Sequence, residues 1–381
     1  MKILILGGDG YLGWPTAMYL SNRGYEVLIV DDYSRKKIAN DTNSQALIEG
    51  ENMYERCEIF HHYYGKRINF KEQDLKDFDQ FQIIFKDFMP DTVVHYAEQP
   101  SAPLSMMNFD MASYTLNNNL NVTFNLIWSV IKNKKKCHIV KLGTMGEYGT
   151  PDIDIEEGWL EINHKNRSDK FLFPRQASSL YHTTKILDTD LLWFYVRSNK
   201  LIVTDLMQGP VYGILTSESA KSKKLFPNFH YDSIFGTVIN RFLVQALVNH
   251  PLTVYGGGTQ IRGYLNINDT LKCIELAIKN PPKPGVLDIK NQITETFAVN
   301  EIAEIVKDAA NEEGLNSTIK KIKNPRFEKE KHYYNPTYSS FKKLGLKSSK
   351  FDKDFCRTFI KSLSPFKKNI DTTKIIPEIK W

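Results

Sequence analysis

Short apolar runs alternate with longer amphipathic stretches through the first half of the chain. The apolar runs predict six strands, at Lys2–Leu6, Glu26–Asp31, Arg67–Phe70, Thr92–Tyr96, His138–Leu142 and Ile202–Leu206. Helical periodicity predicts helices between them, at Tyr11–Asn22, Phe78–Phe88, Met111–Lys132 and Ser178–Ser198. Strands and helices that alternate at this spacing form parallel βαβ units, so we expect an α/β fold with a Rossmann-type doubly wound parallel sheet.

From about Met207 the alternation loosens, and loops rich in Pro, Gly, Ser and Asn become frequent. Further helices are expected at Thr237–Val248, Asn268–Lys279 and Val299–Glu312. We therefore expect a first domain over residues 1–206 and a smaller C-terminal lobe over residues 207–381, with parts of 237–290 returning to the first domain. The long connection over residues 34–64 is expected to carry a helix around Ser44–Glu58.

The sequence GGDGYLG lies between the first predicted strand and the first predicted helix. Gly7, Gly10 and Gly13 have the GxxGxxG spacing, which permits a tight turn and lets a pyrophosphate approach the backbone. The N-terminus of the following helix then directs free N–H groups at the phosphates. This arrangement predicts a dinucleotide-binding first domain.

Asp31 ends the second predicted strand, where its carboxylate can accept hydrogen bonds from both ribose hydroxyls of NAD and repel a 2′-phosphate. NAD is therefore the expected cofactor, although Arg35 and Lys36 nearby leave NADP open. Asp74 follows the third predicted strand and is expected to contact adenine, with a helix N-cap as the alternative. Further cofactor contacts are expected from Tyr11, Leu12, Asp32, Leu75, Asn118 and Val211.

Tyr181 and Lys185 form a Tyr-xxx-Lys pair that follows the fifth predicted strand and opens a helix. One helical turn puts both side chains on the same face. Because a phenol has a pKa of about 10, we expect the Lys185 ammonium and a positively charged nicotinamide to favour the phenolate. Thr144 can hydrogen-bond the same substrate hydroxyl, or simply satisfy the backbone at its strand end. The set predicts hydride transfer from a substrate alcohol to NAD.

These residues, together with IRGYLNINDT at Ile261–Thr270, resemble the extended short-chain dehydrogenases/reductases that act on nucleotide sugars. Longer blocks resemble the UDP-sulfoquinovose synthase family within that superfamily: GGDGYLGWPTA, VVHYAEQPSAPLSM, HIVKLGTMGEYGTPDIDIEEG, DSIFGTVINRF, and HPLTVYGGG with QIRGYL. The resemblance covers essentially the whole chain. It implies that UDP-glucose and sulfite are converted into UDP-sulfoquinovose with tightly held NAD, so that the first domain binds NAD and the lobe binds the nucleotide sugar.

The resemblance implies four chemical steps. The sugar is oxidised at C4, with Tyr181 as base and NAD as hydride acceptor. Water is then lost across C5 and C6 to give a 4-keto-5-ene, sulfite adds to C6, and hydride returns to C4. No net redox change occurs.

Nucleotide-sugar 4,6-dehydratases usually carry Thr-Asp-Glu where this chain has Thr144-Met145-Gly146-Glu147, so Met145 occupies the place of the acid. His182, beside the base, is unusual for either dehydratases or epimerases. We therefore expect His182 and Glu147 to handle protons at C5 and C6. A wall role for His182 and an orienting role for Glu147 are the alternatives.

Two other functions are weighed against the sulfoquinovose synthase. The first is a UDP-glucose 4-epimerase or a nucleotide-sugar 4,6-dehydratase, which the Met145 and His182 pattern disfavours. The second is a non-catalytic NAD-binding scaffold, against which the presence of Thr144, Tyr181 and Lys185 argues.

A UDP diphosphate calls for guanidinium partners, because the planar fork matches phosphate oxygens. Arg262 is the strongest candidate, followed by Arg241 and Arg326, with surface ion pairs as the alternative for each. Gln208 and Asn118 are expected to hydrogen-bond sugar and cofactor groups. Pro100 stands where the family usually carries Arg, so the resemblance does not say where sulfite binds. Pocket walls are expected from Ser101, Met106, Met107 and the segment Thr150–Gln176.

The net charge of +6 is uneven, with +11 in residues 320–381 and −5 in the remainder. The basic residues are dispersed and accompany no nucleic-acid-binding motif, so we expect a solvated surface and no nucleic-acid partner. Four widely spaced cysteines without a CxxC pair argue against a disulfide framework or a metal site and fit a reducing cytoplasm.

No apolar run approaches the roughly 20 residues that span a bilayer, so no membrane association is expected. The predicted helices Met111–Lys132 and Ser178–Ser198 carry apolar faces. Enzymes of the resembled superfamily commonly dimerise through the equivalent helices, which predicts a homodimer.

Overall fold

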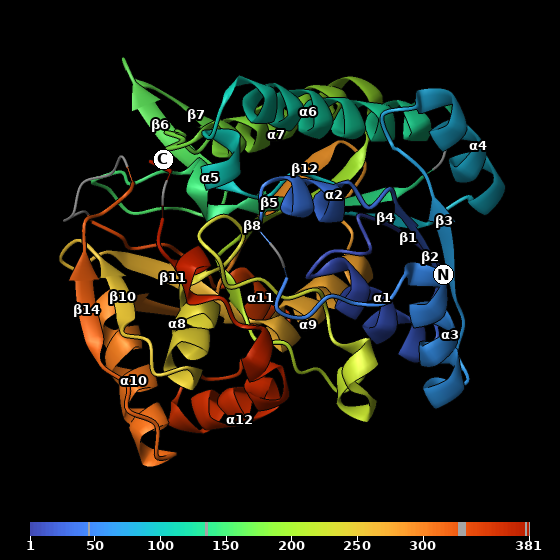
Figure 1. Ribbon diagram of the computed structural model, residues 1–381. Helices are drawn as coiled ribbons and strands as arrows, with labels where there is room; N and C mark the ends of the chain where they lie inside the picture. Colours follow the sequence, from blue (N-terminus) through green and yellow to red (C-terminus); the bar gives the residue numbers. More distant parts are fainter. Residues whose placement is uncertain (45, 134–135, 327–332, 378, 381) are drawn as a thin grey trace.

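A computed structural model describes residues 1–44, 46–133, 136–326, 333–377 and 379–380. Its centre is a seven-stranded sheet with the strand order β12-β8-β5-β4-β1-β2-β3, in which every neighbouring pair is parallel (Figure 1). The strands are β1 (Lys2–Leu6), β2 (Glu26–Asp31), β3 (Ile68–Glu72), β4 (Thr92–His95), β5 (His138–Thr144), β8 (Ile202–Gln208) and β12 (Val286–Gln292). The predicted doubly wound α/β fold is confirmed.

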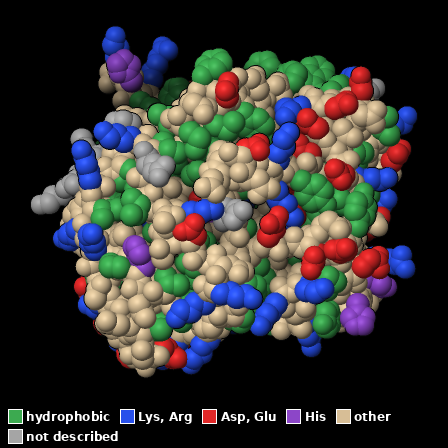
Figure 2. All heavy atoms as spheres, in the orientation of Figure 1, with side chains coloured by type: hydrophobic (Ala, Val, Ile, Leu, Met, Phe, Trp, Pro, Cys, Tyr) green, Lys and Arg blue, Asp and Glu red, His purple; other side chains and the backbone are tan. Residues whose placement is uncertain are grey.

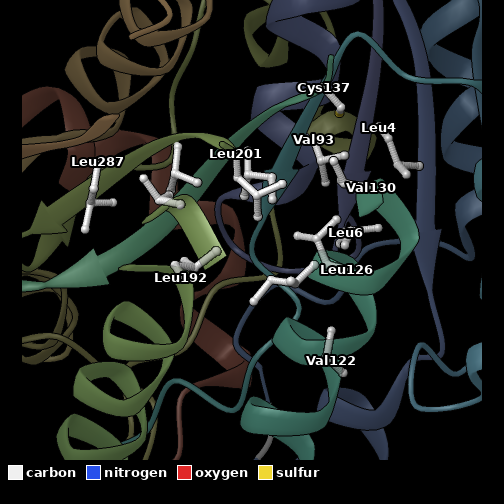
Figure 3. Close-up of a cluster of buried hydrophobic side chains, with 14 of the residues drawn as sticks. Leu4, Leu6, Val93, Val122, Leu126, Val130, Cys137, Leu192, Leu201 and Leu287 are labelled. Carbon is white, nitrogen blue, oxygen red and sulfur yellow. The ribbon is translucent and has the colours of Figure 1, made fainter. Parts of the chain in front are cut away.

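Helices cover both faces of this sheet. They are α1 (Gly13–Asn22), α3 (Met53–Tyr64) and α9 (Ile267–Lys279) on one face, and α4 (Phe78–Phe88), α6 (Phe109–Lys132) and α7 (Leu180–Asn199) on the other (Figure 1). Side chains along a strand alternate between faces. Leu4 and Leu6 therefore pack into the cluster beneath α6, whereas Ile3 and Ile5 pack beneath α1 (Figure 3).

A second group of elements forms its own core beside the sheet. It contains α8 (Val238–Leu247), α10 (Val299–Glu312) and α12 (Lys353–Leu363), with two small sheets, β9 (Val211–Tyr212)–β11 (Ile261–Asn266)–β13 (Glu295–Ala298) and β10 (Leu252–Tyr255)–β14 (Ile319–Ile322). α9 and β12 also come from the C-terminal half of the sequence, but they belong to the central sheet layer. α9 packs against the sheet, and β12 is its edge strand next to β8. The division at residues 206 and 207 stays a prediction.

The remaining elements are short. They are α2 (Ser34–Asp41), α5 (Ala102–Ser105), α11 (Ser340–Lys343) and the 3₁₀ turns η1 (Met145–Glu147), η2 (Ser219–Lys221), η3 (Lys223–Leu225), η4 (Ser364–Asn369) and η5 (Thr372–Ile375). Among the described residues, none of the helices combines the length and apolar character that crossing a membrane requires.

The helix expected around Ser44–Glu58 is wrong in its first half. α3 begins only at Met53, because the side chain of Asn52 caps it by accepting the N–H of Glu55. Residues 46–52, which the structure describes, contain no helix, and Ile48 forms an isolated antiparallel bridge with Phe229. The pairing with a distant segment replaces the local helical hydrogen bonds.

The segment Thr150–Gln176 also differs from expectation. Its middle forms an exposed hairpin of β6 (Trp159–His164) and β7 (Arg167–Leu172), and only its ends face the central cavity. Figure 2 shows Lys, Arg and His side chains at the protruding tip of this hairpin. The expectation that the whole segment walls the pocket is therefore wrong.

Candidate active site

One cavity of about 780 Å³ runs along the carboxyl ends of the central strands. It crosses the point where the strand order reverses, between β1 and β4, which is where ligands bind in open α/β sheets. Its walls come from the glycine loop, from the residues after β4 and β5, from the start of α7 and from the second group of elements. The cavity therefore brings both halves of the sequence to one site.

Most of the predicted site residues line this cavity. On the cofactor side these are Gly7, Gly10, Tyr11, Leu12, Gly13, Asp31, Asp32, Arg35, Asp74, Leu75, Asn118 and Val211. On the substrate side these are Thr144, Met145, Tyr181, His182, Gln208, Arg241, Arg262 and Arg326. Lys185 and Glu147 are not among the lining residues and lie buried behind them.

The glycine loop has the shape that a pyrophosphate requires. Gly7 has φ +83°, and a Cβ on it would lie 2.7 Å from the Ala97 nitrogen. A Cβ on Gly13 would lie 2.2 Å from the Gly7 oxygen, so this position also excludes a side chain. At Gly10 the nearest atom would be 3.6 Å away, which leaves the backbone open to the cavity. These glycines fit a bound dinucleotide.

The adenosine end of the site is charged and buried. Asp31 accepts the N–H groups of Asp9 and Tyr33 at 2.9 and 2.8 Å. Burial, with the neighbouring Asp9 charge, raises the pKa of Asp31 to about 7. The Arg35 guanidinium lies 5.0 Å from the Phe235 ring, and its Nε makes no hydrogen bond within the described chain. An unsatisfied buried guanidinium at a cavity wall fits a ligand with oxygen acceptors.

Asp74 is not the N-cap of α4, because Asp77 caps that helix. Its Oδ1 accepts the N–H of Lys76, and its side chain remains partly exposed at the cavity. The helix-cap alternative for Asp74 is therefore wrong, and its contact with adenine stays a prediction.

Tyr181 is held at the start of α7, where Ser179 caps the helix and Ser105 Oγ accepts the Tyr181 N–H at 3.1 Å. Thr144 ends β5, and its Oγ1 accepts the N–H of Gly146. The contact with Gly146 fixes Thr144 at the end of β5, and the contact with the distant Ser105 fixes Tyr181 at the start of α7. Both side chains line the same cavity.

The electrostatics of this pair differ from expectation. Burial, followed by the charges of Glu98 and Glu147, raises the pKa of Tyr181 above its ordinary value. Lys185 Nζ lies 2.5 Å from Glu98 Oε1, so its positive charge is already offset. Lys185 and a positively charged nicotinamide are together expected to favour the phenolate; the carboxylate of Glu98 offsets the ammonium, and the joint effect with the nicotinamide stays a prediction.

Glu147 is fully buried beneath the end of β5. Its Oε1 accepts the Thr144 N–H at 3.1 Å, and its other contacts are to Lys141 and Thr189. Arg175 Nη1 lies 3.5 Å from its second oxygen. These contacts fit the alternative in which Glu147 orients Thr144. The expected proton transfer by Glu147 at C5 and C6 does not fit, because the carboxylate does not reach the cavity.

His182 faces the cavity over Gly146. A Cβ at Gly146 would lie 2.3 Å from His182 Nε2, so the glycine makes room for the imidazole. Nδ1 lies within hydrogen-bond distance of Ser178 and Ser179. Burial, followed by the charges of Arg326 and Arg262, lowers the pKa of His182 to about 3. The ring is therefore neutral near pH 7.

The remaining predicted polar residues come from α8, β8, β11 and the stretch after β14. Arg241 on α8 donates to the Tyr255 hydroxyl at 2.9 Å and stacks on that ring, so it is not a surface ion pair. Gln208, at the end of β8, donates to Gln292 at 3.0 Å. Arg262 on β11 and Arg326 reach the same cavity. Tertiary packing collects these groups opposite the glycine loop.

Several lining residues were not predicted. Glu98 and Gln99 follow β4, and the segment 228–238 contributes a further wall. Glu98 stands within the block VVHYAEQPSAPLSM, where an acid immediately after a buried strand was the available signal. Ser101 lines the cavity as expected, whereas Met106 and Met107, which follow α5, do not, and Met106 is exposed to solvent.

The model of the NAD dependent epimerase/dehydratase family matches residues 3–289. The chain is 43% identical to the chloroplastic UDP-sulfoquinovose synthase of Spinacia oleracea, over 100% of this chain and 79% of that protein. It is 41% identical to the UDP-sulfoquinovose synthase of Sulfolobus acidocaldarius, over 100% of this chain and 98% of that protein.

Solved structures of more distant proteins share the fold. The UDP-glucose 4-epimerase of Bifidobacterium longum, in complex with NAD⁺ and UDP, superposes with a TM-score of 0.72 at 20% identity, covering 96% of this chain and 98% of that chain. The chain thus belongs to the NAD-dependent epimerase/dehydratase family of extended short-chain dehydrogenases/reductases, and within it to the UDP-sulfoquinovose synthases. It is an NAD-dependent enzyme that acts on a UDP-sugar.

Proposed function

We propose that this protein makes UDP-sulfoquinovose from UDP-glucose and sulfite. The observation that carries the proposal is that Thr144 and Tyr181 share one cavity with Met145 and a neutral His182. The first pair suits oxidation of a sugar hydroxyl. Met145 cannot supply the acid that a 4,6-dehydratase uses, and a simple epimerase needs no group for elimination. The identity to two UDP-sulfoquinovose synthases supports the same choice.

The first step oxidises the alcohol at C4: a hydride leaves C4 and a proton leaves the C4 hydroxyl. Tyr181 takes the proton of the C4 hydroxyl, while Thr144 holds that oxygen by a hydrogen bond. NAD, when bound, accepts the C4 hydride and returns it at the end of the cycle. The buried Glu147 fixes the Thr144 backbone and keeps its side chain directed at the sugar.

The second step is loss of water. A ketone at C4 acidifies the C5–H bond, so that proton loss from C5 and hydroxide loss from C6 leave a C5–C6 double bond. We assign the proton transfer at these carbons to His182, whose neutral imidazole faces the cavity; the negative charge of a bound UDP-sugar would raise its low pKa toward the range that a general base needs. Sulfite then adds through sulfur to C6, and C5 regains a proton.

The diphosphate is expected at the end of the cavity that holds Arg262, Arg326 and Arg241. Arg262 and Arg326 both lower the pKa of His182, which shows that their positive field reaches the ring. The same field would attract a sulfite dianion. This supports a sulfite position near His182, in a chain where Pro100 replaces the arginine usual in the family.

We further propose a cytoplasmic homodimer with an NAD-binding domain over residues 1–206 and a nucleotide-sugar lobe over 207–381. The four cysteines are free and buried, which fits a reducing compartment. α6 and α7 pack side by side and expose apolar side chains, including Phe109 at 82% and Phe194 at 55%. Light scattering that finds only monomers at working concentration would reject the dimer.

The deciding experiment uses purified protein, UDP-glucose and isotopically labelled sulfite. Mass spectrometry of the nucleotide sugar is expected to show incorporation of labelled sulfonate. Formation of UDP-galactose alone would favour the epimerase, and a 4-keto-6-deoxy sugar would favour the dehydratase. Absence of any change in the sugar, with NAD bound, would favour the non-catalytic scaffold.

A further inference from the structure

Glu98 is a buried acid at the floor of the cavity, directly after β4. It lines the cavity, its side chain is 4% exposed, and neither carboxylate oxygen makes a well-oriented hydrogen bond within the described chain. Its near contacts are cationic or potentially cationic: Lys185 Nζ at 2.5 Å and His95 Nε2 at 3.6 Å. Burial lowers the pKa of His95 to about 4, so Lys185 is the cation on this carboxylate near pH 7.

The ionisable groups around this pair come from every neighbouring element. They are Tyr181, Lys185 and Asp188 of α7, His95 of β4, Lys141 of β5, Glu147 of η1 and Asp205 of β8. Burial, followed by the charge of Glu98, raises the pKa of Asp188 well above its ordinary value. Burial would also raise the pKa of Glu98, but the Lys185 charge offsets this and brings it below its ordinary value. The Lys185 charge thus favours the ionised form of Glu98, and burial favours the protonated form of Asp188.

We propose that Glu98 is a positioning residue for the oxidation step: it holds the Lys185 ammonium and, by offsetting its charge, sets the pH at which Tyr181 becomes a base. The inference rests on the proposed role of Tyr181. A lone ammonium would stabilise a nearby phenolate over several ångströms, whereas an ion pair acts as a dipole whose field falls off faster. A buried ammonium without a partner would itself tend to lose its proton.

This arrangement gives a reason for the carboxylate. With the charge of Lys185 offset, the ammonium does not hold the pKa of Tyr181 down permanently, so the charge of the group opposite the phenol can decide whether it keeps its proton. An oxidised nicotinamide is positive and a reduced one is neutral. Tyr181 therefore releases its proton more readily before hydride transfer and retains it afterwards, as a reaction that returns hydride to C4 requires.

The test is a spectroscopic pH titration of Tyr181 in NAD-loaded protein, without sugar or sulfite. Ultraviolet absorbance of phenolate is recorded, and the titration of Tyr181→Phe is subtracted so that only this phenol remains. Glu98→Gln is expected to lower the midpoint by about one pH unit, a tenfold change in proton affinity. Asp190→Asn is the matched control and is expected to leave the midpoint in place, because Asp190 lies exposed on the same helix and pairs with Arg175 at 3.6 Å.

An unchanged midpoint in Glu98→Gln protein, with the NAD content and circular dichroism of the parent, would overturn the inference. An equal shift in Asp190→Asn would overturn it as well, since the effect would not be specific to Glu98. If Glu98→Gln does not fold, Glu98→Asp decides. Glu98→Asp keeps the negative charge but moves it away from Lys185. A lowering of the Tyr181 midpoint that is smaller than about one pH unit supports the inference, and an unchanged midpoint rejects it. Failure to incorporate sulfite would contradict the proposed function without changing this titration.

Discussion

Arg56 and Asp9 form a buried ion pair between α3 and the glycine loop, with Arg56 Nη1 3.1 Å from Asp9 Oδ1. The other guanidinium nitrogen donates to the Phe226 carbonyl, and the group stacks on Trp14 at 4.6 Å. Asn228 donates to the backbone and side chain of Asp9. The pair therefore joins the glycine loop to two segments that are distant in sequence, around the cofactor end of the cavity.

Arg56→Met is expected to destabilise the protein by about 3–5 kcal/mol, because it leaves a buried carboxylate without its main partner. Denaturant unfolding measures the loss, and NAD content measures the effect on the glycine loop. Arg357→Met is the control, since Arg357 pairs with Glu312 at the surface, where solvent screens the pair, and its loss is expected to change the stability far less. Equal losses in both variants would contradict a special role for the buried pair.

NAD affinity is expected to rise with pH between about pH 6 and pH 8. The raised pKa of Asp31, about 7, means that this carboxyl is largely protonated below that pH and cannot accept hydrogen bonds from both ribose hydroxyls. Binding therefore releases a proton at low pH, and affinity levels off once the carboxylate is ionised. Calorimetry in buffers of different ionisation enthalpy measures this directly. Asp31→Asn protein should bind NAD more weakly and without the pH dependence. If its NAD affinity keeps the pH dependence of the parent, Asp31 is not the group that controls binding.

Tyr181→Phe is expected to lower turnover by about 100-fold or more while NAD remains bound, because the base is removed and the ring is kept. Tyr338→Phe is the matched control. Tyr338 and Lys342 have the same spacing, but Lys342 stacks on the Tyr338 ring at 4.6 Å and the pair does not line the cavity. Turnover by Tyr338→Phe should equal that of the parent.

His182→Gln is expected to separate oxidation from elimination. Reduction of bound NAD by UDP-glucose should persist, because Tyr181 and Thr144 are unchanged, whereas sulfonate formation should fall by about 100-fold or more. Absorbance of the reduced cofactor and mass spectrometry of the sugar report the two steps. Gly146→Ala should give the same pattern, since its Cβ would occupy the place of the imidazole. Parallel loss of both steps would show instead that His182 only shapes the pocket.

Local patterns predicted six of the seven strands of the central sheet, because an apolar run bounded by turn residues and followed by a helix reflects burial on both faces. Gly13 was identifiable because the backbone that excludes a side chain there lies a few residues away, whereas at Gly7 that backbone belongs to Tyr96 and Ala97 and only the glycine spacing gave the signal. The Tyr181 and Lys185 pair was found because one helical turn relates the two residues.

Contacts between residues that are distant in the sequence could not be predicted from local sequence patterns. The partner of Lys185 is Glu98, 87 positions away in the sequence, and its carboxylate offsets the ammonium; burial and this negative charge raise the pKa of Tyr181. Glu147 was predicted as a proton carrier, but burial beneath β5 turned it toward Lys141 and Arg175. Sequence by itself determined which groups are available and the elements that carry them. Only the tertiary structure decided which of them share a cavity, because burial and charge pairing depend on packing between segments that no local pattern encodes.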